Sequence, residues 1–311
     1  MDTLAVVLEG PEKIAVRSLD LNPVHDDDIV VEVSWSGIST GTERLLWSGR
    51  MPQFPGMGYP LVPGYESVGH VIATGANAQH RLGEYVFLPG ATCYKDARGL
   101  FGGAARTLIA PSARAIQIQE RLGARGVLLA LAATAHHAIA GGAPPDLIVG
   151  HGVLGRLLAR ITIAMGAPAP NVWEIDPQRR GSAFGYAVLD PEDDPRRDYK
   201  TIIDASGSSA VLDTLVMRLA KGGEIVLAGF YEERLSFAFV PTFMREARLR
   251  VAAEWKPEDL HATQALVRFG RLSLDELITH EHAPEDAADA YATAFADSAC
   301  LKMVLDWRHC A

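Results

Sequence analysis

The sequence is poor in the features that define several large classes of protein. It has three cysteines in 311 residues, and Cys93, Cys300 and Cys310 form no C-x-x-C pair, which excludes a dense disulfide framework. No apolar run approaches the roughly 18 residues of a membrane span, and no basic segment precedes an apolar run near Met1. We therefore expect a cytoplasmic protein with reduced thiols and no transmembrane segment.

Positive charge is also scarce. The chain has 29 Lys and Arg against 38 Asp and Glu, which gives a net charge of −9 and a pI near 5.6. Nucleic acids and anionic membranes both favour clustered Lys and Arg, so neither is expected as the main partner. The length of 311 residues suits two domains, each with its own core.

Residues 146–165, DLIVGHGVLGRLLARITIAM, predict a buried strand, a glycine turn and a helix in one run. Three glycines in this run fit the dinucleotide motif G-x-G-x-x-G, which acquires meaning only in this strand–turn–helix context. The first glycine permits the tight turn, the second lets the backbone approach a pyrophosphate, and the third lets helix and strand pack closely. The predicted cofactor-binding turn consists of Gly150, His151, Gly152, Val153, Leu154 and Gly155. His151 either reaches the cofactor or is a tolerated loop residue.

The next strand, NVWEID at residues 171–176, is expected to end on a carboxylate. Asp176 lies 21 residues beyond Gly155, close to the roughly 20 expected for the acid that binds the adenosine ribose. This carboxylate would repel a 2′-phosphate and therefore favours NAD, although Arg179 and Arg180 weaken the distinction because a nearby arginine accommodates NADP. The predicted cofactor site is completed by Arg180, Thr134 and Ser206.

The two halves of the chain have different periodicities. Short strands separated by Gly and Pro fill residues 4–113, which predicts an irregular antiparallel barrel. The loop at residues 49–63, GRMPQFPGMGYPLVP, is too rich in Gly and Pro to be regular, and its Met, Phe and Tyr would line an apolar site or cap a core. A final strand at 301–305 would return to this barrel.

The second half predicts a doubly wound parallel sheet of about six strands, so the fold class is α/β. After the glycine motif we expect strands at residues 187–189 and 201–205, with a short or absent crossover helix between them. A helix at 210–221 would then lead through Gly222 and Gly223 into a buried strand at 224–228.

Four stretches together resemble the medium-chain dehydrogenase/reductase superfamily, the family of the zinc alcohol dehydrogenases. They are WSGISTGTE (35–43), PLVPGYESVGHV (60–71), TAHHA (134–138) and the glycine motif. The resemblance implies a GroES-like catalytic domain built from both ends of the chain, with a Rossmann NAD-binding domain between. We place the first part of the catalytic domain at 1–118, the Rossmann domain at 119–257 and the return segment at 258–311.

The departures from the zinc pattern predict that no metal is bound. Ser39 stands where the zinc members have a cysteine after G-[IV], and Tyr65 stands where they have the histidine of G-H-E. Near the third ligand position the run is Leu131-Ala-Ala133, and a lobe of clustered cysteines is absent. A hydroxyl and a phenol are poor zinc ligands beside thiolate and imidazole.

Residues 38–69 resemble more closely a family of dehydrogenases of bacteriochlorophyll biosynthesis. This resemblance implies NAD-dependent oxidation of the 3-(1-hydroxyethyl) side chain of a bacteriochlorophyllide to the 3-acetyl group. The implied substrate is a flat, mostly apolar tetrapyrrole, for which the loop at 49–63 would be suitable. The sequence leaves a homo-oligomer open.

Alcohol oxidation without zinc requires a positioned base. Tyr65 is the first candidate to hydrogen-bond the reacting oxygen, and Glu66 or His137 would act as the base or its orienter. A packed barrel tyrosine, a structural salt bridge of Glu66 and a satisfied helix histidine remain alternatives. Hydroxyls that could relay a proton to solvent are those of Ser39, Thr40 and Thr42.

Two other functions stay open at this point. A zinc-free quinone or enone reductase would share the fold and transfer hydride in the other direction, and Asp176 speaks against its usual NADPH. A non-catalytic dinucleotide-binding protein would keep cofactor binding and turn over no alcohol.

Overall fold

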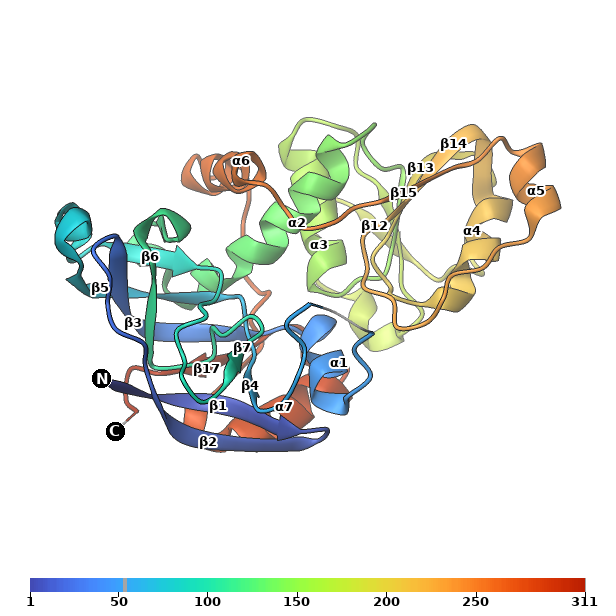
Figure 1. The fold of residues 1–311 in the computed structure, drawn as a ribbon. Helices are drawn as coiled ribbons and strands as arrows, with labels where there is room; N and C mark the ends of the chain where they lie inside the picture. The colour runs from blue at the N-terminus through green and yellow to red at the C-terminus, as the bar shows by residue number, and fades with distance from the viewer. Residues whose placement is uncertain (53–54, 311) are drawn as a thin grey trace. The chain divides into compact units, whose positions relative to one another are not determined.

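The computed structural model describes residues 1–52 and 55–310, so Gln53 and Phe54 of the predicted apolar loop lie outside the described residues. The chain divides into unit 1, Met1–Ala130 with Leu277–Ala311, and unit 2, Leu131–Glu276. Both termini belong to unit 1 (Figure 1). The segments follow the predicted order, but both boundaries fall later in the chain than the predicted 118/119 and 257/258.

Local packing explains the later boundaries. Residues 120–128 form a 3₁₀ segment, η3 (Glu120–Leu128), in unit 1, where a Cβ on Gly126 would meet Val68 at 2.8 Å. At the other boundary, α6 (Pro257–Arg268) belongs to unit 2 because its Asp259 accepts hydrogen bonds from α2 (Leu129–Ala140).

Unit 2 contains the predicted parallel sheet, with strand order β12-β11-β10-β13-β14-β15 among the described residues. All its pairings are parallel, which confirms the doubly wound class. The strand order reverses between β10 and β13, and the carboxyl ends of strands at such a switch point are where ligands bind. The strands are β10 (Leu147–Val149), β11 (Asn171–Trp173), β12 (Ala187–Leu189), β13 (Tyr199–Asp204), β14 (Leu219–Leu227) and β15 (Arg248–Val251).

Helices cover both faces of this sheet, as the unbroken apolar strands predict. Leu147 and Val149 point into a core with α4 (Leu212–Arg218). Ile148 points the other way, towards Gly155 of α3 (Val153–Ala164). Figure 1 shows α3 on one side of the strands and α4 with α5 (Phe239–Met244) on the other.

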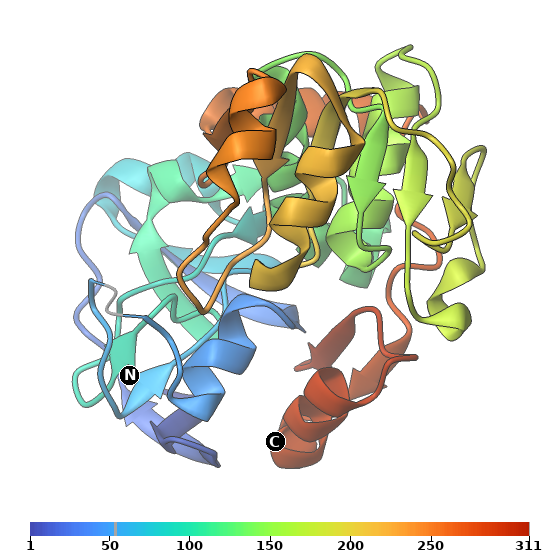
Figure 2. The same ribbon diagram turned by 90° about the vertical axis from the view of Figure 1, so that its right-hand side faces the viewer.

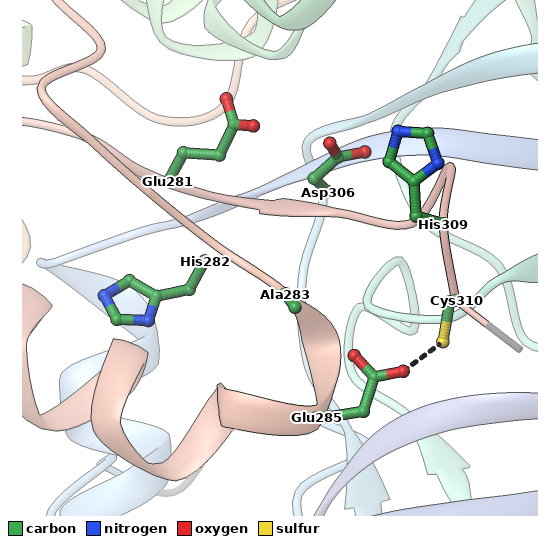
Figure 3. A pocket seen from close by; sticks show the side chains of 7 residues that line it. All are labelled: Glu281, His282, Ala283, Glu285, Asp306, His309 and Cys310. Carbon is green, nitrogen blue, oxygen red and sulfur yellow. Dashed lines mark hydrogen bonds between the residues drawn. The ribbon is translucent and has the colours of Figure 1, made fainter.

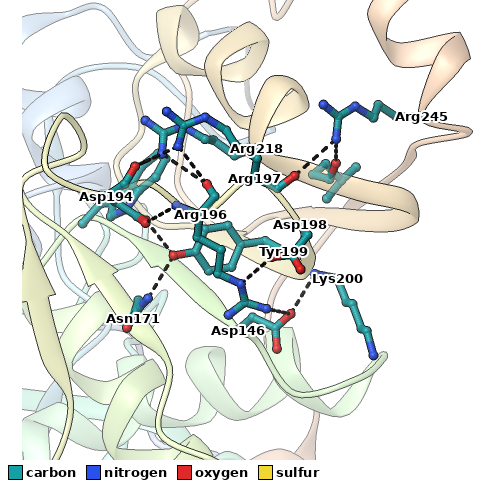
Figure 4. A network of polar contacts seen from close by, with 12 residues as sticks. Asp146, Asn171, Asp194, Arg196, Arg197, Asp198, Tyr199, Lys200, Arg218 and Arg245 are labelled. Carbon is teal, nitrogen blue, oxygen red and sulfur yellow. Dashed lines mark hydrogen bonds and ion pairs between the residues drawn. The ribbon is translucent and has the colours of Figure 1, made fainter.

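A buried aspartate organises the connection from β12 to β13, which is free of helix as predicted (Figure 4). Asp194 is 2% exposed and accepts from Trp173 Nε1 at 2.7 Å and from the Tyr199 hydroxyl at 2.6 Å. Burial acts to raise the pKa of Asp194, but these hydrogen bonds and the Arg196 amide outweigh it and hold the pKa below its usual value. Side-chain hydrogen bonds therefore fix this connection.

The predicted helix at 210–221 is wrong at its end. The helix α4 stops at Arg218, and Leu219 already pairs with Tyr199 as the first residue of β14. Arg218 donates to the backbone carbonyls of Asp194 and Pro191, which anchors the helix end to the loop of Figure 4. Leu219 is fully buried, so tertiary packing overrides the helical pattern.

Unit 1 is the predicted barrel of short strands. Its two sheets have the orders β2-β1-β4-β7 and β16-β17-β3-β5-β6-β9, with β8 also paired to β3. The antiparallel pairing of β17 with β3 confirms that the C-terminal segment returns to the first domain. The strands are β1 (Asp2–Gly10), β2 (Lys13–Asp20), β3 (Asp28–Ile38), β4 (Leu61–Val62), β5 (Ser67–Thr74), β6 (Tyr85–Leu88), β7 (Arg98–Gly99), β8 (Thr107–Pro111), β9 (Ile116–Gln117), β16 (His280–His282) and β17 (Met303–Asp306).

Two helices accompany these strands, α1 (Thr42–Ser48) and α7 (Ala287–Ala296). Figure 2 shows α1 in blue and α7 in red. The buried side chains of α7, among them Tyr291, join the core formed by β1, β3 and β17.

By length and composition alone, residues Glu120–Ala140 could cross a membrane, but 56% of the apolar window is buried inside the protein. Gly123 has φ 51°, so the backbone leaves the helical path inside this run. These properties are those of a core helix. Cys93, Cys300 and Cys310 are all buried, and none of them is in a disulfide within the described residues.

Candidate active site

Three hydroxyl groups converge where β3 ends and β5 begins. Ser39 follows β3 directly, Tyr65 comes two residues before β5, and Thr42 opens α1. The Ser39 Oγ and the Tyr65 hydroxyl are 2.6 Å apart, and Thr42 also hydrogen-bonds the phenol. The structure therefore brings together three of the residues predicted to act in catalysis.

The Tyr65 phenol holds its proton tightly. Burial is the largest cause of its raised pKa, and the negative charge of Glu66 adds to it, while the bonds from Ser39 and Thr42 act against it. Part of the residue remains accessible to solvent, and its ring packs edge-on against Phe101 at 5.3 Å. Tyr65 can thus donate or pass on a proton as a neutral phenol.

Glu66 forms a buried ion pair. It is 0% exposed, and Lys302 at 1% donates to both of its oxygens, at 2.8 and 3.0 Å. A Cβ on Gly37 would lie 2.1 Å from Glu66 Oε2, so glycine is needed there. Burial raises the pKa of Glu66, and Lys302 opposes the rise. This geometry favours the structural salt bridge over a free base.

A second buried acid, Glu43, lies behind the hydroxyl cluster. Its Oε1 accepts from the Ser39 backbone N–H at 2.9 Å, and its Oε2 accepts from the Tyr291 hydroxyl at 2.7 Å. Burial raises the pKa of Glu43 to about 7, against the lowering effect of these two bonds. No sequence pattern pointed to Glu43, Tyr291 or Lys302 as site residues.

In unit 2, the three glycines of the turn meet the geometric demands of the dinucleotide motif. Gly150 has φ 96°, which favours glycine, and a Cβ on Gly155 would lie 1.8 Å from the Gly150 carbonyl oxygen. A Cβ on Gly152 would meet no protein atom within 4 Å, so open space lies beside this glycine. Val153 then opens α3, with Leu154 next to it in the first turn, where backbone N–H groups are available to an anion.

Asp176 is tied into the start of a 3₁₀ turn, η4 (Pro177–Arg180), three residues beyond the end of β11, and not at a strand end as predicted. Its Oδ1 accepts from the Gln178 N–H at 2.9 Å. Its neighbour Glu174 accepts from the N–H groups of Asp176 and His151, at 2.9 and 3.0 Å. Glu174 was not among the predicted cofactor-site residues. The signal that could have revealed it is an acid directly after the strand sequence NVW.

The side chains of His151 and Arg180 are engaged within the protein. The His151 ring nitrogens bond the Arg179 carbonyl oxygen at 2.6 Å and the Tyr186 hydroxyl at 2.8 Å, and burial lowers the pKa of His151 to about 4. Arg180 bonds the Glu174 carbonyl oxygen and pairs with Asp190. This geometry disfavours the predicted contacts of these two side chains with a cofactor.

Ser206 lies beside the glycine turn, and Thr134 lies on α2. The Ser206 hydroxyl and N–H both donate to Asp204 at the end of β13, at 2.6 and 2.9 Å. A Cβ on Gly150 would lie 3.3 Å from the Ser206 backbone. Gly150 and Ser206 therefore face each other across the switch point of the sheet.

His137 is bound to an aspartate of its own unit. The Nδ1 atoms of His136 and His137 each lie 2.8 Å from one oxygen of Asp259. Asp259 also accepts from the Lys256 N–H at the start of α6. The arrangement favours the satisfied helix histidine and joins α2 to α6.

The residues at the zinc positions do not fit the metal. Ser39 and Tyr65 are hydrogen-bonded to each other, and Glu66 is paired with Lys302. Across residues 1–52 and 55–310, no group of three His, Cys, Asp or Glu side chains could hold a metal ion. The acidic pocket of Figure 3, with Glu281, His282 and Cys310 in its lining, is no exception.

A doubly wound sheet carrying G-x-G-x-x-G, joined to a GroES-like barrel from both chain ends, defines the class of the medium-chain dehydrogenases/reductases. Residues 25–120 match the family model "Alcohol dehydrogenase GroES-like domain". Over 99% of both chains, the sequence is 58% identical to the 2-desacetyl-2-hydroxyethyl bacteriochlorophyllide A dehydrogenase of Cereibacter sphaeroides. The chain therefore belongs to the family of this bacteriochlorophyllide dehydrogenase.

Solved structures agree on the fold. An Escherichia coli alcohol dehydrogenase complexed with NADH matches with a TM-score of 0.84 and 19% identity, over 98% of this chain and 99% of that one. A Sinorhizobium meliloti dehydrogenase bound to NADP matches with the same TM-score and 20% identity, over the same shares of the two chains. One of these two structures therefore holds NADH and the other NADP.

Proposed function

We propose that the protein oxidises the 3-(1-hydroxyethyl) group of a bacteriochlorophyllide to the 3-acetyl group with NAD. The observation that carries this proposal is the 58% identity, over nearly the whole of both chains, to a relative named for a desacetyl, hydroxyethyl bacteriochlorophyllide. Removing two electrons and two protons from –CH(OH)CH₃ gives the acetyl group that this name describes as missing. The products are the ketone, NADH and one proton.

The cofactor is proposed to occupy the switch point of unit 2. Its pyrophosphate would use the open space at Gly152 and the N–H groups at the start of α3, beside Ser206. Thr134 of α2 is proposed as a further cofactor contact. Asp176 would accept from the ribose hydroxyls with the oxygen that Gln178 does not use, which lies 4.0 Å from Arg179 Nε. Because Arg180 is held by Asp190 and a backbone carbonyl, it offers little to a 2′-phosphate, which supports NAD.

When bound, NAD supplies the hydride acceptor. Tyr65 would hydrogen-bond the alcohol oxygen and accept its proton as the phenol proton passes to Ser39, since these two hydroxyls are already 2.6 Å apart. Thr42, which bonds the same phenol, and Thr40 are proposed as the further hydroxyls that would relay the proton to solvent. Charge that develops on the reacting carbon would spread into the conjugated ring of the substrate, which makes a Lewis acid less necessary.

The reaction is proposed to be independent of metal, because hydroxyl groups replace the thiolate and imidazole ligands of the zinc enzymes. Glu66 and His137 are proposed to be structural, because Lys302 and Asp259 hold them. A cytoplasmic location remains a prediction, which cell fractionation would test. A homo-oligomer also remains a prediction, which light scattering would test.

The direct test is to incubate the purified protein with a 3-(1-hydroxyethyl) bacteriochlorophyllide and NAD. We expect the pigment's absorption to shift as NADH appears in equal amount. Appearance of a product only with NADPH and an enone would support the reductase alternative. Cofactor binding with no turnover would support the non-catalytic one.

A further inference from the structure

Two buried acids lie near Tyr65, and a buried cation pairs with one of them. Glu43 and Glu66 are both 0% exposed, and Lys302 is the buried cation that contacts Glu66. An ammonium group has three donors, and Lys302 directs its own to two oxygens of Glu66 and to the Ile38 carbonyl oxygen. None remains for Glu43.

Glu43 has neutral hydrogen-bond partners in place of a cation. They are the Ser39 N–H and, from α7, the Tyr291 hydroxyl. Of the charged groups packed around it, Glu66 disfavours its ionisation and Lys302 favours it. A buried carboxylate without a paired cation binds its proton more tightly than in water, so burial raises the pKa of Glu43 to about 7.

Glu43 is also coupled to the reacting hydroxyls. It holds the backbone of Ser39, whose Oγ contacts the Tyr65 hydroxyl. It directly follows Thr42, which bonds the same phenol. Its negative charge, when present, acts on Tyr65 together with that of Glu66.

We propose that Glu43 is a positioning residue of the Tyr65 site, which fixes Ser39 through its amide and controls, through its own charge, how readily Tyr65 takes up a proton. The role rests on the proposed function. As the alcohol proton reaches Tyr65 and the phenol proton moves towards Ser39, positive charge develops on these hydroxyls. An ionised Glu43 attracts this charge and favours oxidation. A protonated Glu43 removes that attraction and slows it.

The first experiment compares pH profiles of kcat for the wild type and Glu43→Gln. Glutamine can accept from Ser39 and donate to Tyr291, so it resembles protonated Glu43 at every pH. We expect wild-type oxidation to rise severalfold through a step near neutral pH, where Glu43 ionises. The variant should lack this step and keep the low-pH rate.

Tyr291→Phe provides a second variant. It removes a donor that favours ionised Glu43 and keeps the ring, so the step should move to higher pH without disappearing. Glu32→Gln, an exposed change on β3, is the matched control and should leave the profile unaltered. If Glu43→Gln does not fold, the direction of the Tyr291→Phe shift decides the question.

A measurement without substrate separates this inference from the proposed function. Burial raises the pKa of Glu43 in the folded protein to about 7, from 4.5 for an exposed carboxyl group. The contribution of Glu43 to stability is therefore complete below the lower pKa and is lost as pH rises to the higher one. The urea midpoint should therefore fall more across this range in the wild type than in Glu43→Gln. The role of Glu43 would be overturned if the urea midpoints of the two proteins fell equally, or if Glu43→Gln lowered kcat at every pH and kept the step in its pH profile. If the midpoints behaved as expected but neither protein turned over the substrate, only the proposed reaction would be overturned.

Discussion

The Tyr65 hydroxyl lies 2.6 Å from the Ser39 Oγ, although the two residues are 26 positions apart in the chain. The pairing between β3 and β5, which sets Ser36 opposite Ser67, brings these two chain segments together. Both residues stand where zinc dehydrogenases have metal ligands. The same strand pairing thus holds two hydroxyl groups at the positions of two metal ligands. The first two predictions concern these hydroxyl groups.

Tyr65→Phe should lower turnover by about a hundredfold or more, the loss expected when one acid/base partner is removed. Affinity for NAD should not change, because Tyr65 is proposed to contact the alcohol oxygen and not the cofactor. Steady-state kinetics and cofactor titration measure the two quantities. Tyr94→Phe is the control: its hydroxyl bonds the Gly102 carbonyl oxygen, so it should cost about 1 kcal/mol of stability and no turnover. An unaltered rate in Tyr65→Phe would return the residue to a packing role.

Prolonged chelation should leave turnover intact. The reason is the donor set, since a serine hydroxyl and a phenol bind zinc poorly compared with thiolate and imidazole. Metal analysis of the active protein should find far less than one zinc per chain. Stoichiometric zinc whose removal stopped the reaction would contradict the roles proposed for Ser39 and Tyr65.

The sequence predicted the parts of this structure that depend on local pattern. The parallel sheet, its glycine turn and the helix-free connection before β13 follow from short apolar runs and their spacing. The end of α4 at Arg218 does not, because it depends on carbonyls of the loop that contains Asp194. Helical periodicity carries no information about such partners.

The candidate site shows the same division. Ser39 and Tyr65 could be found because each replaces a motif residue. Lys302 and Tyr291 could not, because they lie 236 positions from Glu66 and 248 from Glu43. Only the return of the C-terminal segment to the barrel brings them near, and no local pattern records those pairings.

Gly152→Val should abolish dinucleotide binding and leave the fold intact. A Cβ at this position meets no protein atom within 4 Å, whereas one at Gly155 would lie 1.8 Å from a carbonyl oxygen. The valine would fill the space proposed for the pyrophosphate. Calorimetric titration with NAD and circular dichroism check the two claims. Gly155→Ala is the paired variant and should unfold more easily; tight NAD binding by Gly152→Val would place the pyrophosphate elsewhere.

Asp176→Ser should relax the preference for NAD over NADP by about 1 to 3 kcal/mol, because it removes a charge-assisted hydrogen bond to ribose and the repulsion of a 2′-phosphate. The ratio of kcat/KM for the two cofactors measures the change. Asp190→Ser tests whether Arg180, once released from Asp190, adds to NADP binding. Equal use of both cofactors by the wild type would contradict the assignment of Asp176.

Lys302→Met should destabilise unit 1 by about 3 to 5 kcal/mol, because it leaves the fully buried Glu66 carboxylate without its cation. Glu66→Gln alone leaves the ammonium unpaired and should also be costly. The double variant Glu66→Gln/Lys302→Met removes both charges, so its loss should be much smaller than the sum of the two single losses. Urea denaturation of the four proteins gives this comparison. If the single losses simply added, the ion pair would not hold the barrel as the 2.8 Å contact indicates, and Glu66 would again be a candidate for the base.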